Sequence, residues 1–253
     1  MPQTTEMTAE MTAEMTADMA ADVRRSLDLD GEPVAIAFLQ EPPVGVAAWD
    51  GGPVVAGCVF WREARQGQTF YTEPSDHYAC AVGSHVHGIA LPDDRAGELT
   101  DAVTLMAGAA YVDPSEVPSI PTVEQSPRYI AYGPAGAVPF EPDVVVVAAT
   151  PAKAMLVHEA ALRAGVTPMT APTAGRPGCA VLPLSMQSGQ AAMSLGCAGN
   201  RISTGLDDGE LYTAIPGSGW PGVVEALSTV LEANATMGAY YRDRLGRVAD
   251  PGS

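Results

Sequence analysis

The four cysteines of this chain fall in two short segments with matching spacing, and this feature constrains the fold more than any other. The first segment places Cys58 and Cys80 22 residues apart, and the second places Cys179 and Cys197 18 residues apart. In each segment a Gly-Gln pair lies between the cysteines, and a glycine follows the second cysteine by eight residues. The pattern predicts an internal duplication that brings two cysteine pairs to one place.

Short apolar runs alternate with helix-like segments along the chain. The apolar run 34–38 predicts a strand, and the four valines at 144–147 predict one buried on both faces, as is typical of a central parallel strand. Pro151 opens a predicted helix over 152–164. We therefore expect an α/β (or α+β) fold with a mixed or parallel sheet, in which two related halves meet at the cysteine segments. Further strands are expected over 69–72, 129–132, 179–184 and 211–215, and further helices over about 20–27, from Cys58 to Gly67, and over 98–109 and 221–236.

We expect residues 23–253 to form one globular domain of two pseudo-repeats, at about 27–125 and 129–240. Four prolines between 114 and 127 predict a linker between them with little regular structure. Residues 1–22 repeat a Thr-Ala-Glu-Met unit, and this low complexity indicates a frayed or disordered acidic tail. The alternative is a helix that docks on a partner, because the methionines of this tail are spaced four apart.

The charge of the chain excludes several classes of partner. The net charge is -17 and Lys153 is the sole lysine, so no basic patch is present to bind nucleic acid or an anionic membrane surface. No apolar run approaches the ~20 residues that span a bilayer, and the first residues lack the layout of a signal peptide. We therefore expect a cytoplasmic protein, in which clustered cysteines more often hold metal than form disulfides.

Cys58, Cys80, Cys179 and Cys197 are the predicted metal ligands. Neither pair forms the Cys-x-x-Cys turn of structural zinc sites, so the ligands would come from four separate loops. This spacing favours a [4Fe–4S] cluster at the junction of the halves, with zinc as the alternative and buried, unliganded cysteines as the simplest other reading. Glycines beside the cysteines would let the backbone approach and donate N–H groups to sulfur, and four of them are candidate cofactor-binding residues: Gly57, Gly83, Gly196 and Gly199.

His77, His87 and Arg201 are the candidate catalytic residues. The two histidines flank Cys80 and could donate protons or bind metal, or else satisfy a glycine-rich turn. Arg201 offers a planar donor fork for an anionic substrate, with a surface ion pair as the alternative. His158, on a helix face with apolar residues, is expected in the core. Cys80 also remains a candidate nucleophile because histidines lie near it.

The motifs around the cysteines resemble those of the family called domain of unknown function 169. The most specific match is Leu195-Gly196-Cys197-Ala198-Gly199-Asn200-Arg201, and the resemblance runs from about Leu27 to Leu231. Further matches are the stretch from His77 to Gly83, Pro142-Asp143 and the run from Pro151 to Met155. All four cysteines coincide with cysteines of the family pattern. The resemblance implies a soluble prokaryotic protein with a suspected iron–sulfur role, and it implies no particular reaction.

From these observations we expect an iron–sulfur enzyme that acts on a small molecule by redox or Lewis-acid chemistry. The alternative is a non-catalytic protein, either a zinc-stabilised binding module or an electron-transfer partner of another protein. The expected partners are a small-molecule substrate or a redox protein, with a homo-oligomer possible.

Overall fold

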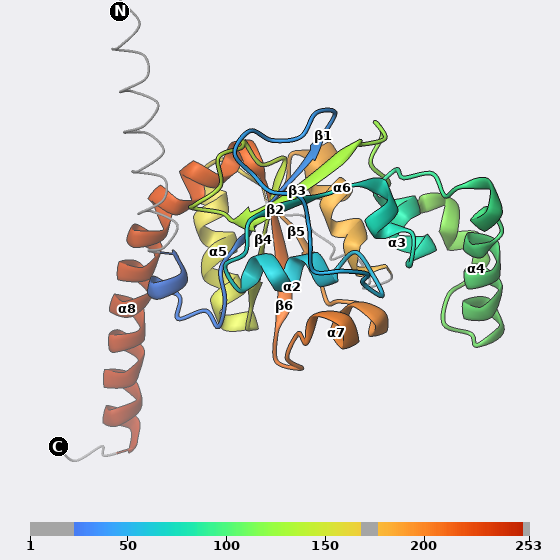
Figure 1. Ribbon diagram of the computed structural model, residues 1–253. Coiled ribbons are helices and arrows are strands. Elements are labelled where there is room, and N and C mark those ends of the chain that lie inside the picture. The colour runs from blue at the N-terminus through green and yellow to red at the C-terminus, as the bar shows by residue number, and fades with distance from the viewer. Residues whose placement is uncertain (1–22, 168–176, 250–253) are drawn as a thin grey trace, which may run out of the picture.

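A six-stranded sheet forms the centre of the molecule (Figure 1). The computed structural model describes residues 23–167 and 177–249. The sheet order is β2-β3-β1-β4-β6-β5, and every neighbouring pair of strands is antiparallel. The strands are β1 (Val34–Leu39), β2 (Phe70–Thr72), β3 (Tyr129–Pro134), β4 (Val144–Ala149), β5 (Ala192–Ser194) and β6 (Leu211–Pro216).

The expectation of a mixed or parallel sheet is therefore wrong, and the fold is α+β. Strand β4 is central and buried on both faces, as the four valines predicted. Burial on both faces requires a layer of helices on each side of the sheet, and it does not determine the direction of the neighbouring strands. The antiparallel arrangement of β4 with β1 and β6 is thus compatible with the same apolar run.

Helices cover both faces of the sheet, and β4 contributes alternate residues to the two cores. Val145 and Val147 pack into one core with α5 (Pro151–Arg163) and α8 (Trp220–Ala249). Val144 and Val146 pack into the other core with α2 (Val59–Arg65) and α6 (Val181–Ser188). Three further helices are α3 (Ala81–Val86), α4 (Glu98–Gly108) and α7 (Ala198–Thr204). None of the helices in the described ranges is long and apolar enough to cross a membrane.

Two expected elements differ from those observed. Residues 179–184 form no strand, but a short 3-10 turn (η4, Gly178–Ala180) followed by the start of α6. Pro183 is accepted there because the N–H groups of a first helical turn need no intrahelical partner. Helix α8 extends to Ala249 rather than residue 236, because its exposed part continues after the apolar periodicity that packs on the sheet has ended.

The strand order is symmetric about the β1–β4 pair, since β3 and β6 flank this pair and β2 and β5 form the edges. Helix α2 precedes β2 as α6 precedes β5, and α3 follows β2 as α7 follows β5. A duplication would produce this arrangement, and it would place β3 in the first repeat rather than in the second. The duplication itself stays a prediction.

The glycines of the repeated motif have a common conformational role. Gly67 and Gly189 follow the ends of α2 and α6 with φ values of 101° and 66°. Gly88 and Gly205 follow the ends of α3 and α7 with φ values of 70° and 67°. Positive φ is the left-handed conformation in which helices commonly end, and glycine adopts it without a Cβ clash. The matched spacing of the glycines in the two cysteine segments therefore reflects two helix ends in each segment, at equivalent positions.

Candidate functional site

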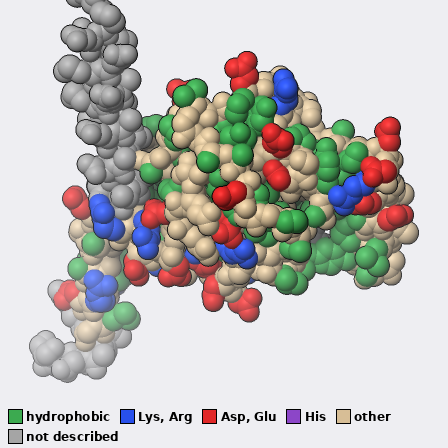
Figure 2. Space-filling view, in the orientation of Figure 1, with side chains coloured by type: hydrophobic (Ala, Val, Ile, Leu, Met, Phe, Trp, Pro, Cys, Tyr) green, Lys and Arg blue, Asp and Glu red, His purple; other side chains and the backbone are tan. Residues whose placement is uncertain are grey.

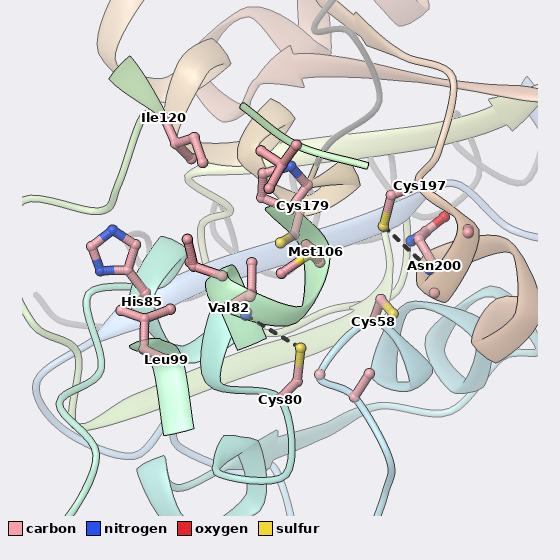
Figure 3. A pocket seen from close by; sticks show the side chains of 18 of the residues that line it. Cys58, Cys80, Val82, His85, Leu99, Met106, Ile120, Cys179, Cys197 and Asn200 are labelled. Atoms are coloured by element: carbon pink, nitrogen blue, oxygen red, sulfur yellow. Dashed lines mark hydrogen bonds between the residues drawn. The ribbon is translucent and has the colours of Figure 1, made fainter. Parts of the chain in front are cut away.

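All four cysteines line one cavity of about 300 Å³ (Figure 3). Cys58, Cys80 and Cys197 immediately precede α2, α3 and α7, and Cys179 lies in the turn that leads into α6. Four helix starts thus bring the thiols together, and none of the four cysteines forms a disulfide. The segments that hold the cysteines converge as the sequence indicated.

Two of the thiols accept hydrogen bonds at matching positions. The Gly83 N–H donates to the Cys80 Sγ at 3.3 Å, and the Asn200 N–H donates to the Cys197 Sγ at 3.4 Å. In both helices the donor is the third residue after the cysteine, so the sulfur takes the place of a capping oxygen. These backbone donors fix two of the four sulfur positions and would stabilise negative charge on them.

Burial and repulsion from neighbouring thiolates raise the pKa values of three of the thiols, those of Cys58, Cys80 and Cys179. Burial raises the pKa of Cys58 to about 12, and the charges of Cys80 and Cys197 add to the effect. Burial also raises the pKa of Cys80, and it raises that of Cys179 well above its ordinary value, with contributions from all three other cysteines. An activated nucleophilic cysteine requires a lowered pKa, so these shifts do not favour Cys80 as a nucleophile.

The two candidate histidines lie together, His87 on the cavity wall and His77 behind it, with ring centroids 5.5 Å apart. The Thr72 hydroxyl donates to the Ile130 carbonyl at 3.2 Å, so its contact of 2.8 Å with the His77 Nε2 makes that nitrogen the donor. Within the described part of the chain, the Nδ1 of His77 and both ring nitrogens of His87 have no hydrogen-bond partner. His87 is therefore the histidine placed to contact a ligand. The half-buried His85 also lines the cavity.

Both histidines are expected to lower stability in acid. Burial lowers the pKa of His87 to about 4, and burial together with the charge of His87 lowers that of His77 well below its ordinary value. The unfolded chain then binds more protons than the folded chain between pH ~6.5 and pH ~4, so stability falls as the pH falls through this window. From pH 7.5 to 5, His87 alone should lower the free energy of unfolding of the metal-free protein by about 2 kcal/mol. Urea unfolding measures this loss, and a His87→Phe variant with undiminished pH dependence would contradict it.

Arg201 does not face the cavity. Its guanidinium donates to the backbone carbonyls of Leu195, Asp207 and Glu210, at 2.6 to 2.9 Å. The side chain thus fastens the loops on either side of α7, and its donor fork is engaged by the protein itself. Arg201 thus holds the backbone next to Cys197 in place. The donor groups that an anionic substrate would need are occupied, so the structure gives no support for the expected anionic substrate.

The candidate cofactor-binding glycines fall into two groups. At Gly57, a Cβ would lie 2.6 Å from the His77 Nδ1, and at Gly83 it would lie 3.2 Å from the Cys80 Sγ. Gly196 has a φ of 73° and would bring a Cβ within 3.0 Å of the Asn200 Oδ1. Gly199 faces open space on the cavity wall. Of these glycines only Gly83 makes room beside a cysteine sulfur, whereas Gly57 and Gly196 make room for His77 and Asn200. Their role in cofactor binding stays a prediction.

The cavity also has an apolar wall that the sequence reasoning missed. Helix α4 contributes Leu99, Val103 and Met106, whose spacing of four and three residues places them on one face of the helix. The expected linker contributes the rest and contains a 3-10 segment (η3, Pro114–Ser119). Its lining residues are Tyr111, Val112, Val117 and Ile120. The apolar residues between the prolines were the sequence signal for this wall.

His158, expected in the core, is half-buried, with its Nε2 3.3 Å from the Thr213 Oγ1.

The fold and the site define an α+β protein in which four thiols from four helix starts line one cavity. The chain belongs to the family described as DUF169, uncharacterised ArCR, whose model matches residues 22–226. This match confirms the resemblance drawn from the cysteine motifs. Comparisons with curated proteins and with solved structures give no match.

Proposed function

We propose that Cys58, Cys80, Cys179 and Cys197 hold a [4Fe–4S] cluster. The observation that carries the proposal is the convergence of four thiols from four segments on one cavity. The pKa values of Cys58, Cys80 and Cys179 are raised, so loss of protons from these thiols requires a positive charge among them. Iron ions supply that charge, and thiolate sulfur is their usual ligand in such clusters.

The thiols are not gathered around one point, as a single zinc ion would require. No three His, Cys, Asp or Glu side chains in the described ranges lie close enough together to hold one metal ion. Zinc requires all its ligands at about 2.0–2.3 Å from one centre. In a cubane each thiolate binds a different iron, so the sulfur atoms remain further apart. The donor N–H groups of Gly83 and Asn200 fit the hydrogen bonding that cluster sulfurs receive.

We further propose that the protein is an enzyme acting on a small molecule within this cavity. When bound, a cluster would carry single electrons or, through an iron without a cysteine ligand, act as a Lewis acid. The chain adds a binding wall from α4 and η3 and a buried neutral imidazole, His87, which can donate at one nitrogen and accept at the other.

Thiol labelling tests the proposed ligands one by one. The protein is treated with N-ethylmaleimide before and after anaerobic reconstitution with iron and sulfide, and each cysteine is followed by mass spectrometry. We expect all four cysteines to be labelled in the metal-free protein only over hours, because the raised pKa values of Cys58, Cys80 and Cys179 leave few reactive thiolates, and at least three to be protected over the same time after reconstitution. Equal labelling in both samples would contradict the proposal, and protection by zinc alone would favour the zinc-stabilised module.

A further inference from the structure

Much of the wall of the cavity is apolar. Leu99, Val103 and Met106 of α4 line it together with Val117 and Ile120. No Asp, Glu, Lys or Arg is found among the described residues that line the cavity. Figure 2 shows hydrophobic side chains concentrated towards the α4 end of the molecule, whereas acidic side chains are scattered over the surface. A charged ligand would lose its hydration here without gaining a partner of opposite charge.

Two buried polar side chains on the same cavity have hydrogen-bonding groups to offer. Asn200 is 2% exposed and His87 is 1% exposed. The ring nitrogens of His87 have no hydrogen-bond partner within the described residues. The amide nitrogen and oxygen of Asn200 have no nitrogen or oxygen partner there, and the amide lies beside the Cys58 thiol, whose pKa it lowers through a hydrogen bond. Figure 3 places Asn200 beside Cys197, on the cysteine side of the cavity. Buried polar groups are normally paired, so these two side chains indicate a ligand with a complementary polar group.

We propose that the cavity binds an uncharged, largely apolar organic molecule that carries one hydrogen-bonding group, such as a carbonyl, hydroxyl or amide. Its apolar body packs against Leu99, Val103 and Met106, and its polar group pairs with Asn200 or His87 beside the thiols. This inference rests on the proposed function for the role of the ligand as substrate. Binding itself depends on the wall and the two polar side chains, and so it can be measured whether or not a cluster is present.

A pair of fluorescent probes tests the expected charge selectivity. N-phenylnaphthylamine is neutral, and anilinonaphthalene sulfonate has the same aromatic frame with an added negative charge. We expect saturable binding of the neutral probe by the purified full-length protein, at least tenfold tighter than that of the anionic probe. Absence of saturable binding, or equal affinity for both probes, would overturn the inference.

Two substitutions on α4 locate the binding site. Met106→Gln keeps the shape of a side chain in the cavity wall and adds an amide, whereas Leu105→Gln makes the same chemical change at a neighbour that is 75% exposed. Met106→Gln is expected to weaken binding of the neutral probe at least fivefold, and Leu105→Gln is expected to leave it unchanged. Equal effects of both changes would overturn the inference. Iron and sulfide are measured in the same samples, so probe binding by protein that remains free of iron after anaerobic reconstitution would retain this inference and count against the proposed cluster.

Discussion

Replacing Cys179 with serine is expected to lower the iron content of the reconstituted protein from about four atoms per chain to less than about one. The charges of all three other cysteines raise the pKa of Cys179, so its thiol lies within electrostatic reach of each of them. Serine keeps the approximate size of the side chain and removes the soft sulfur ligand that iron–sulfur clusters require. Iron and acid-labile sulfide analysis measures the loss, together with the absorbance near ~400 nm.

Met106→Leu is the matched control for this substitution. It removes a sulfur atom from the wall of the same cavity, but a thioether that takes no part in the proposed ligand set. The control should retain full iron and sulfide. A Cys179→Ser variant that also retains both would contradict the four-cysteine assignment, and circular dichroism of each variant separates the loss of a ligand from a loss of fold.

Gly57→Ala is expected to destabilise the protein by about 3 kcal/mol, because it overpacks the wall behind the cysteines. The new methyl group would lie 2.6 Å from the His77 Nδ1. His77 has little room to retreat, since it contacts Thr72 through Nε2 and packs between Phe60 and His87. Urea unfolding at pH 7.5 measures the change in the free energy of unfolding.

Gly199→Ala provides the comparison for Gly57→Ala. Gly199 lies in the first turn of α7, where a methyl group meets no atom within 4 Å. Alanine is favoured over glycine in helices, so this variant is expected to be equal in stability or up to about 1 kcal/mol more stable. Equal destabilisation by both substitutions would contradict the close packing of Gly57 on His77.

The local features around the cysteines follow short-range rules, although α3 and α7 were not among the helices expected from the sequence. The matched cysteine spacing corresponds to equivalent helix starts, at which a backbone N–H donates a hydrogen bond to the sulfur of Cys80 and of Cys197. The matched glycines reported helix ends, where Gly88 and Gly205 have positive φ. Pro151 likewise marked the first residue of α5. Each of these signals is contained within a single turn of the chain.

Features that depend on long-range contacts could not be read in this way. The valines of β4 indicated burial, but strand direction is set by pairing with β1 and β6, which are distant in the sequence. The short apolar run after Cys179 fits a strand or a buried helix equally well by periodicity. From the sequence, the guanidinium of Arg201 was expected to be free to bind an anion. It instead donates to the carbonyls of Leu195, Asp207 and Glu210, which only the folding of the loops around α7 brings to it.

The apolar wall of the cavity shows the same limit at the site itself. The prolines between 114 and 127 indicated a linker, whereas Val117 and Ile120 of this segment line the cavity that the cysteines share. Figure 1 shows α4 at the end of the molecule opposite α8, where it packs against α3. The sequence contains the apolar residues of α4, but it does not show that they line the same cavity as the four thiols.

Anaerobic purification followed by an absorbance spectrum and by iron, zinc and sulfide analysis tests the central claim most directly. The account predicts a brown protein with a broad band near ~400 nm that is lost on reduction, and about four irons and four sulfides per chain. A colourless protein that remains free of iron after anaerobic reconstitution with iron and sulfide would contradict it.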